Sequence, residues 1–280
     1  MRRRPSRRLM AALIVPLLAL SAPARADAGA LEALIRERTA SIEDKLIAWR
    51  RDIHQHPELG DQEVRTAGLV AAHLNALGLE VRTGVARTGV VAVLRGAMPG
   101  PTVALRADMD ALPVKEPEGL PFASKAKATY LGKEVDVMHA CGHDAHTAML
   151  MAAAEVLTSL KDRLPGTVQF LFQPAEEGPS LFPPSSGRSW GAKLMVEEGV
   201  FAATRPEAVF GLHVMPGRSG EIAYRPGAAL ASSDTLEIEV TGRQGHGGMP
   251  WSTIDPITTS ALIINGLQTV VSRKADLIAS

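Results

Sequence analysis

The sequence contains little cysteine and few aromatic residues. Its single cysteine, Cys141, has no second cysteine to pair with in this chain of 280 residues, which excludes an intramolecular disulfide. Phe, Trp and Tyr together make up 4% of the residues, so we expect Ala, Val and Leu to build the core. With 46% hydrophobic and 21% charged residues, the composition is typical of a globular protein with one large or two smaller domains.

Acidic residues are absent from the first 26 residues, which carry six arginines. A basic segment, residues 1–8, precedes the apolar run 9–20, and Ala24-Arg25-Ala26 fits a small-x-small cleavage site. This order predicts a signal peptide over residues 1–26, and the apolar run is shorter than the roughly 20 residues that span a bilayer. An uncleaved membrane anchor is the alternative. The arginine pair in Ser6-Arg7-Arg8-Leu9 leaves general and twin-arginine export both open.

Removal of this segment leaves 24 basic and 30 acidic residues, a formal net charge of −6. We expect the mature protein to be exported to the periplasm. A mildly acidic protein is a poor candidate for nucleic acid or anionic membranes, because phosphate binding depends on Lys and Arg. We therefore expect no nucleic-acid partner, and no membrane contact after the signal peptide is cleaved.

Hydrophobic periodicity predicts alternating helices and strands over most of the chain. Helical spacing of apolar residues predicts helices at 31–53, 62–77, 144–160 and 190–199. Short apolar or β-branched runs predict strands at 79–83, 89–96, 101–109, 166–172, 207–214 and 219–224. Because strands alternate with helices, we expect an α/β fold with a largely parallel sheet.

The pattern changes near residue 230. Residues 234–242, DTLEIEVTG, alternate apolar and polar side chains as a half-buried strand does, and 254–273 has helical spacing with Pro256 in its first turn. One strand and one helix make a poor independent fold, so we expect residues 229–280 to begin a second domain. The loop 178–189, rich in Pro, Ser and Gly, is predicted to be irregular.

Four clusters of chemically reactive residues fall near predicted strand ends, where ligands bind in open α/β sheets. They are RADMDALP at 106–113, MHACGHDAHTAML at 138–150, QPAEEG at 173–178 and GLHVMP at 211–216.

Four residues from these clusters make a mixed set of sulfur, nitrogen and oxygen donors: Cys141, His143, Glu177 and His213. Such a set suits a borderline transition metal such as Zn²⁺ or Mn²⁺. Cys141 and His143 can share a site only if the backbone between them is not helical, and Gly142 supplies that freedom.

Other interpretations of these residues remain open. In the pair Glu176-Glu177, one carboxylate can bind metal while the other holds a water as general base, or both can be solvated acids on a loop. Cys141 can be a small buried residue, or a nucleophile activated by a neighbouring histidine and Asp144. The nucleophile leaves the glutamates and His213 without a role, whereas a metal site uses all of them.

The remaining histidines of these segments have less specific interpretations. His139 and His146 can be ligands, but we expect them to pack behind the ligands instead. We expect His54 and His56, in DIHQHPELG, to be structural.

Taken together, these segments resemble the M20 metallopeptidase family, and within it the amidohydrolase branch of hippurate, N-acyl-amino-acid and indoleacetyl-amino-acid hydrolases. The matching motifs run in family order over about residues 46–273, and HACGHDAH followed by PAEEG is highly specific. The motifs are RRDIHQHPELG, RTGVVAVLRG, LRADMDALPV, MHACGHDAHTAML, QPAEEG, GAKLMVEEGVF, GLHVMPG and VTGRQGHGGMP.

The resemblance implies a catalytic metal-binding domain over residues 27–228, interrupted by a smaller α+β lid and dimerisation domain that begins at residue 229. It implies metal-dependent hydrolysis of N-acyl amino acids or related small amides, and a homodimer in full-length relatives. It also implies two divalent metal ions, Zn²⁺ or Mn²⁺ first, with Co²⁺ or Ni²⁺ as alternatives.

The resemblance further implies a role for each motif residue. The metal ligands are Cys141, His143, Glu177 and His213. Glu176 is the general base, and Asp110 contacts the ligands from behind. His246, in the lid domain, reaches across the dimer interface to contact substrate and the developing oxyanion.

Two departures from the family pattern carry expectations of their own. Family members continue well beyond the position of Ser280, complete the lid and add a last histidine ligand, so we expect a C-terminally truncated chain that is poorly active or inactive. A non-catalytic metal-binding remnant is therefore an alternative. The loop 178–189 replaces a short Gly-rich link after PAEEG, and we hypothesise that it reshapes the substrate pocket.

Overall fold

The computed structural model describes residues 22–230 and 236–273. They belong to two compact units, which divide between Glu221 and Ile222. The predicted signal peptide lies outside the described residues, apart from residues 22–26, which belong to the first helix. Among the described residues, no helix combines the length and the apolar character that crossing a membrane requires.

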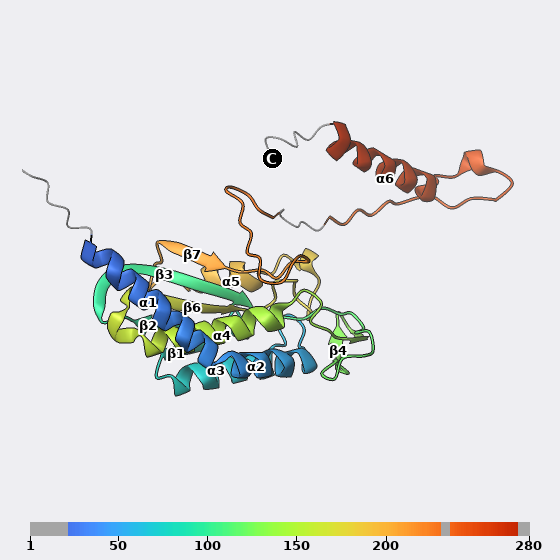
Figure 1. The fold of residues 1–280 in the computed structure, drawn as a ribbon. Helices are drawn as coiled ribbons and strands as arrows, with labels where there is room; N and C mark the ends of the chain where they lie inside the picture. The colour runs from blue at the N-terminus through green and yellow to red at the C-terminus, as the bar shows by residue number, and fades with distance from the viewer. Residues whose placement is uncertain (1–21, 231–235, 274–280) are drawn as a thin grey trace, which may run out of the picture. The chain divides into compact units, whose positions relative to one another are not determined.

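The described elements agree broadly with those predicted (Figure 1). The helices are α1 (Ala22–Ser41), α2 (Glu43–Gln55), α3 (Val64–Ala76), α4 (His143–Ser159), α5 (Gly191–Glu197) and α6 (Pro256–Arg273). The strands are β1 (Glu80–Val85), β2 (Gly89–Arg95), β3 (Met98–Asp108), β4 (Lys127–Tyr130), β5 (Lys133–Asp136), β6 (Pro165–Gln173) and β7 (Ala208–Gly211).

The main sheet has five strands in the order β1-β2-β6-β3-β7. Strand β3 is parallel to both β6 and β7, whereas β1 pairs antiparallel with β2, and β2 antiparallel with β6. The α/β class is confirmed, but the sheet is mixed rather than largely parallel. The turn of residues 86–88 between β1 and β2 is far too short for the crossover that parallel neighbours need.

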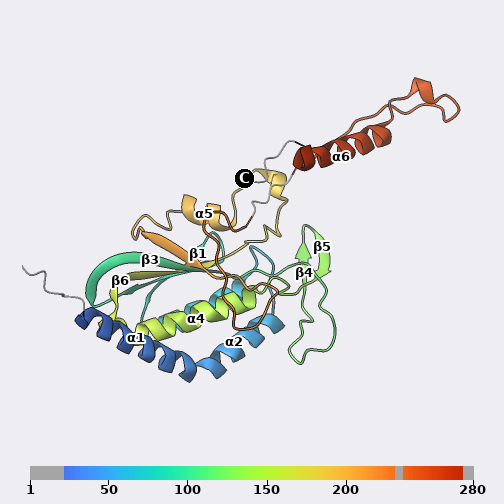
Figure 2. The same ribbon diagram turned by 45° about the horizontal axis from the view of Figure 1, so that its top comes forward.

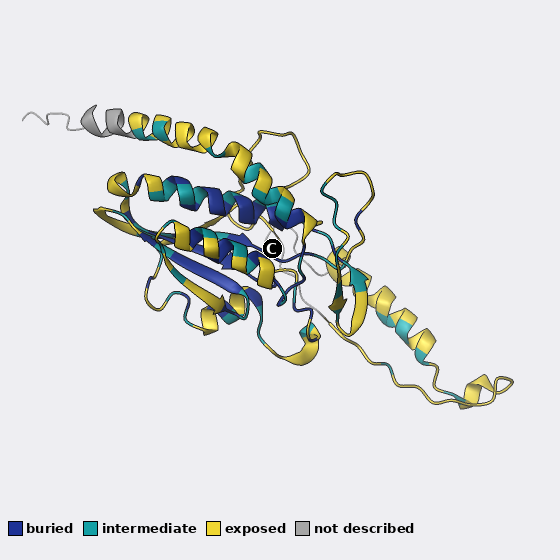
Figure 3. Ribbon diagram, turned by 90° about the horizontal axis from the view of Figure 1, so that it is seen from below, coloured by how far each residue is buried: buried dark blue, intermediate teal, exposed yellow. Residues whose placement is uncertain are grey.

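The core lies on both faces of this sheet, because successive side chains of a strand point to opposite faces. Phe170 and Phe172 of β6 pack with the apolar sides of α2, α3 and α4. Leu171, between them, packs on the other face with Met195 of α5. Figure 2 shows α2 and α4 on one side of the sheet and α5 on the other. In Figure 3, α4 is largely buried, and residues 29–41 of α1 are mostly exposed.

Two local expectations differ from the structure, and one hairpin is present that was not expected. The single helix predicted over 31–53 is divided at Ile42 into α1 and α2, where the Ser41 hydroxyl donates to the Arg38 carbonyl at 2.7 Å and competes with helical bonding. The predicted strand at 219–224 is not formed. The hairpin β4–β5 was not predicted. Its turn, Leu131-Gly132, has positive φ at both residues, the geometry of a two-residue hairpin.

The second unit contains α6, as predicted from residues 254–273. Asp255 caps this helix, because its Oδ1 accepts the Ile257 N–H at 2.9 Å. The described part of the predicted strand, residues 236–242, is not a strand. A strand forms only where its backbone groups can pair with a neighbouring strand. The described residues of this unit contain no strand with which residues 236–242 could pair. The assignment of residues 27–228 and 229–280 as catalytic and lid domains stays a prediction.

Candidate metal centre

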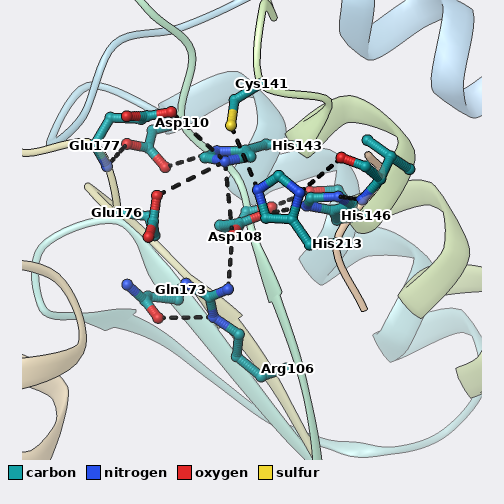
Figure 4. Close-up of polar contacts among 12 residues, drawn as sticks. Arg106, Asp108, Asp110, Cys141, His143, His146, Gln173, Glu176, Glu177 and His213 are labelled. Carbon is teal, nitrogen blue, oxygen red and sulfur yellow. Dashed lines mark hydrogen bonds and ion pairs between the residues drawn. The ribbon is translucent and has the colours of Figure 1, made fainter. Parts of the chain in front are cut away.

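The predicted clusters meet at one edge of the sheet. Strands β6, β3 and β7 are parallel neighbours, so their carboxyl ends lie at the same edge, where α/β proteins bind ligands. Strand β3 ends at Asp108, β6 leads into Glu176-Glu177, and β7 precedes His213. Helix α4 begins at His143 and adds the fourth cluster (Figure 4).

His143 is the centre of this group. Its ring lies with Cys141 and His213 in one set whose potential ligand atoms are all within 4.8 Å of one another, and with Glu176 and Glu177 in another. Cys141 Sγ is 3.4 Å from His213 Nε2. His143 Nε2 is 3.8 Å from Glu176 Oε2 and 3.9 Å from Glu177 Oε1. The four predicted ligands and the predicted base therefore converge.

The orientation of His143 fits a metal ligand. Its side chain is fully buried, and its Nδ1 lies 3.2 Å from Asp110 Oδ1. The other oxygen of Asp110 accepts the Glu177 N–H at 2.8 Å. Among the described residues, His143 Nε2 has no hydrogen-bond partner although it is buried. A ligating histidine typically uses one nitrogen for the metal and the other for a carboxylate, so these residues fit a divalent cation.

Acidic side chains give the site a negative potential. Burial lowers the pKa of His143, but the bond to Asp110 and the charges of Asp108, Asp110 and Glu176 raise it to about 9 overall. Burial raises the pKa of Glu176, and the charges of Asp108 and Asp110 raise it further. A cation bound between these groups would relieve their mutual repulsion.

Cys141 reaches the site through a left-handed glycine. Gly142 has φ +90°, and a Cβ built on it would lie 2.2 Å from Val214 Cγ2. Burial raises the pKa of the Cys141 thiol to about 12, and the contact with Glu177 and the charges of Glu177 and Glu176 contribute. Without a cation, Cys141 therefore remains a thiol.

A third set of potential ligands includes Asp108 and His146, but internal hydrogen bonds occupy both residues. His146 Nδ1 lies 2.7 Å from Asp108 Oδ1, and the Val214 N–H donates to His146 Nε2 at 2.9 Å. The Asp108 pKa is raised by burial, but the His146 bond and the Arg106 charge outweigh this and lower it to about 2. His146, held by Asp108, thus supports the backbone beside His213. This agrees with the expectation that His146 packs behind the ligands.

The first turn of α4 is held by a buried charge network. Asp144 Oδ2 lies 2.9 Å from His54 Nδ1 and 2.7 Å from Arg50 Nε, and His54 Nε2 lies 2.8 Å from Glu116 Oε1. His54 is therefore part of a structural network, and both of its ring nitrogens are occupied within it. His139 is buried beside it, and burial lowers its pKa to about 4.

Two further predicted features are the loop 178–189 and His246. The loop 178–189 is fixed to its surroundings: Gln62 Nε2 donates to Ser180 Oγ at 2.6 Å, and Phe182 is buried between the guanidinium groups of Arg87 and Arg188. Its effect on a substrate pocket stays a hypothesis. His246 belongs to the second unit, and its predicted contact with substrate stays a prediction.

Some residues of the site had no role in the sequence prediction. RADMDALP contains two aspartates, and the sequence indicates a role only for Asp110, although Asp108 holds His146. Asp108 is the last residue of β3, and this position was the one available signal. Glu63 and Glu116, both buried, carry no pattern that separates them from surface acids.

Comparison with known proteins agrees with this geometry. Residues 104–273 match the model of the family described as Peptidase family M20/M25/M40. The chain is 44% identical to Thermostable carboxypeptidase 1 of Saccharolobus solfataricus, over 86% of this chain and 58% of that protein. It is also 44% identical to Hippurate hydrolase of Campylobacter jejuni, over 81% of this chain and 54% of that protein. The chain thus spans little more than half the length of these relatives.

Solved structures share the fold. A protein of methicillin resistant Staphylococcus aureus, described as an aminohydrolase, superposes with a TM-score of 0.68 and 38% identity, covering 88% of this chain and 58% of that one. The YXEP protein of Bacillus subtilis, described as a dinuclear metal binding peptidase from the M20 family, gives a TM-score of 0.53 and 40% identity, covering 63% of this chain and 44% of that one.

Proposed function

This chain belongs to peptidase family M20/M25/M40, and from this premise we propose that it is the major part of a metal-dependent amidohydrolase. The proposed reaction is hydrolysis of the amide bond of N-acyl amino acids or related small amides. Relatives named hippurate hydrolase and N-acyl-L-amino acid amidohydrolase support the substrate class. The proposed cofactor is a pair of divalent ions, Zn²⁺ or Mn²⁺.

The observation that carries this proposal is the convergence of sulfur, nitrogen and oxygen donors around the buried Nε2 of His143, which has no hydrogen-bond partner in residues 22–230 and 236–273. Mixed donor sets of this kind suit borderline transition metals. We propose Cys141, His143, Glu177 and His213 as the ligands. Bound ions would polarise the amide carbonyl and acidify an attacking water.

The proposed base is Glu176. Its side chain is 39% exposed, so it can reach both solvent and substrate, and its raised pKa brings it closer to the working range of a proton carrier. Glu176 takes a proton from the attacking water and passes it to the amide nitrogen as the C–N bond breaks. Asp110 meanwhile keeps His143 and Glu177 in fixed positions, since it contacts both. We propose that His246 donates to the developing oxyanion.

The two alternatives differ from this mechanism in measurable ways. A cysteine nucleophile needs a thiolate, and such cysteines lie beside cationic groups that lower the thiol pKa. Cys141 lies instead beside Glu177 and Glu176, whose negative charges raise the pKa of its thiol. A metal-binding remnant would bind metal and hydrolyse nothing.

The test uses purified chain, stripped of metal and reloaded with Zn²⁺ or Mn²⁺, against a panel of N-acyl amino acids. We expect slow hydrolysis that depends on metal, loss of this activity with metal retained in Glu176→Gln, and loss of metal in Cys141→Ser. Glu80→Gln, the same change on the exposed strand β1, should leave both properties unchanged. Metal binding without any hydrolysis would favour the remnant. Metal-independent activity that only Cys141→Ser removes would favour the nucleophile.

We further propose export to the periplasm and assembly as a homodimer. The support for export is the pattern of residues 1–26, and the support for the dimer is the family resemblance. N-terminal sequencing of protein from the periplasmic fraction should begin at Asp27. Light scattering of the same sample should give twice the mass of the mature chain.

A further inference from the structure

A buried glutamate that is distant in sequence from the ligand motifs contacts the loop that carries the proposed base. Glu63 lies just before α3 and is completely buried. Its Oε1 accepts the Ala175 N–H at 2.7 Å, and its Oε2 accepts the Thr88 hydroxyl at 2.5 Å. Burial of a carboxyl group is costly unless hydrogen bonds compensate it. These two bonds supply that compensation, and the presence of a buried glutamate at this position needs a structural or functional reason.

Ala175 has a conformation that alanine rarely adopts. Its φ is +47°, in the left-handed region where the Cβ of an L-residue clashes with its own backbone. This residue immediately precedes Glu176, so its backbone angles set the direction in which the chain leaves β6. A strained conformation persists only where the surroundings over-determine it.

The surroundings of Ala175 supply that constraint from three directions. Glu63 bonds to its N–H. Gly60 lies so close that an added Cβ would be 3.0 Å from Ala175 Cα, and a Cβ on Gly191 would be 2.7 Å from the Ala175 carbonyl oxygen. The two glycines provide close packing, whereas Glu63 provides the one side-chain hydrogen bond that Ala175 makes within the described part of the chain.

We infer that Glu63 is a positioning residue: its bond to the Ala175 N–H holds the left-handed turn, which directs Glu176 and Glu177 toward His143. The inference rests on the proposed function for its catalytic consequence. Glu63 itself is not proposed to contact substrate. It acts on Glu176 only through the backbone of Ala175, to which it is hydrogen-bonded.

The protonation of Glu63 explains which substitution should preserve this role. Burial, followed by the charge of Asp110, raises the pKa of Glu63 to about 8. A protonated carboxyl still offers a carbonyl oxygen to the Ala175 N–H and can also share a bond with the Thr88 hydroxyl. A glutamine has nearly the same shape and the same acceptor. Glu63→Gln should therefore keep the turn, and Glu63→Ala should release it.

Glu58 offers a matched control, because its side chain contacts the first turn of the same helix, α3. Its two carboxylate oxygens accept the N–H groups of Arg65 and Thr66, both at 2.8 Å, in the first turn of α3. Glu58→Ala thus removes a carboxylate and its hydrogen bonds beside α3, as Glu63→Ala does. It leaves the bond to Ala175 in place, so it reports the cost of a purely structural loss.

The experiment compares the purified chain with Glu63→Ala, Glu63→Gln and Glu58→Ala. Hydrogen exchange is measured over residues 173–178, with and without Zn²⁺, and kcat and KM are measured with an N-acyl amino acid. In Glu63→Ala we expect exchange in this segment to quicken by roughly ten- to hundredfold, as for a lost buried hydrogen bond. We expect kcat to fall about tenfold or more, with little change in KM. Glu63→Gln and Glu58→Ala should keep the exchange rate and kcat of the parent chain.

Two results would overturn the inference: unchanged exchange over residues 173–178 in Glu63→Ala, or equal quickening in Glu58→Ala. If Glu63→Ala does not fold, Glu63→Asp, which is one methylene shorter and cannot reach Ala175, replaces it with the same expectation. If the parent chain hydrolyses no substrate, the proposed function fails, and the exchange comparison alone still decides whether Glu63 holds the turn.

Discussion

The substitution Gly142→Ala tests how tightly the ligand segment is built. Gly142 joins Cys141 to His143 with φ +90°, and an added Cβ would lie 2.2 Å from Val214 Cγ2. Valine has a restricted χ1 angle and the Val214 N–H is bonded to His146, whereas the Val214 side chain is 42% exposed, so the overlap can be relieved only in part. Both backbone strain and steric overlap therefore oppose the alanine.

The magnitude follows from these two effects. A left-handed conformation costs an L-residue about 1–2 kcal/mol. Overpacking costs about 1–3 kcal/mol in a core, and only the lower part of that range applies beside Val214, which is 42% exposed. We expect Gly142→Ala to lower the free energy of unfolding by about 2–3 kcal/mol in total. Zn²⁺ affinity should also fall, because relief of the overlap moves Val214 and with it His213.

Two other glycines separate the contributions. Gly132, in the β4–β5 turn, has φ +81° with nothing within 4 Å of an added Cβ, so Gly132→Ala reports strain alone, about 1–2 kcal/mol. Gly68, inside α3, has open space and no positive φ, so Gly68→Ala should stabilise by up to about 1 kcal/mol.

Urea unfolding followed by circular dichroism measures the three variants, and competition with a chelator measures Zn²⁺ affinity. From the most to the least stable, the expected order is Gly68→Ala, the parent chain, Gly132→Ala and Gly142→Ala. If Gly142→Ala were no less stable than Gly132→Ala and bound Zn²⁺ as the parent does, the reasoning about close packing at the ligand segment would be refuted.

Three further predictions address the groups around the ligands. Asp110→Asn should weaken Zn²⁺ binding about 10- to 100-fold in chelator competition, because it removes the charge that orients His143; Asp52→Asn, an exposed acid, is the control, and equal affinities would contradict the role of Asp110. His146→Ala leaves Asp108 Oδ1 and the Val214 N–H without their bonds to His146, while Asp108 Oδ2 keeps its bond to Arg106, so urea unfolding should show a loss of about 1–3 kcal/mol for each unpaired group; an unchanged midpoint would be inconsistent with this. The pKa of Glu63 is raised to about 8 from 4.5, so the folded chain binds more protons than the unfolded chain between these values and the metal-free parent loses stability as pH rises from 4.5 to 8. Glu63→Gln should lack this loss in urea unfolding at pH 5 and pH 8, and parallel pH dependence of the two proteins would argue against a buried, protonated Glu63.

The convergence of the site could be predicted from the sequence because its motifs follow strands. Asp108, Glu177 and His213 come at or soon after the carboxyl ends of β3, β6 and β7, and parallel neighbours bring such ends together. Each motif also combined several donor types within a few residues, which is uncommon for surface segments. Local pattern and sheet geometry were enough to place these residues near one another.

Strand direction and long-range polar contacts could not be predicted in the same way. The apolar runs of β2 and β6 have the same character whichever way they pair, so their antiparallel pairing has no signal in the sequence. The short turn before β2 indicates only the direction of its pairing with β1. The residues of β4 and β5 are mostly polar, and Leu131-Gly132 is not a common turn sequence. Glu63 resembles an ordinary acid near a helix start, and only the folded chain brings it to Ala175.

The electrostatics of the site connect these observations. The pKa values of three side chains, Cys141, His143 and Glu176, are all raised, and nearby carboxylates contribute to each shift. Burial alone would have lowered the pKa of the histidine while raising the other two, so the common direction points to excess negative charge. A lone nucleophilic thiolate is poorly stabilised in such a field, whereas a divalent cation is attracted to it. The same acids that make Cys141 a weak candidate for a nucleophile therefore make it a good candidate for a metal ligand. Asp110 is central to this balance, since it contributes negative charge and also fixes the ring that the cation would bind.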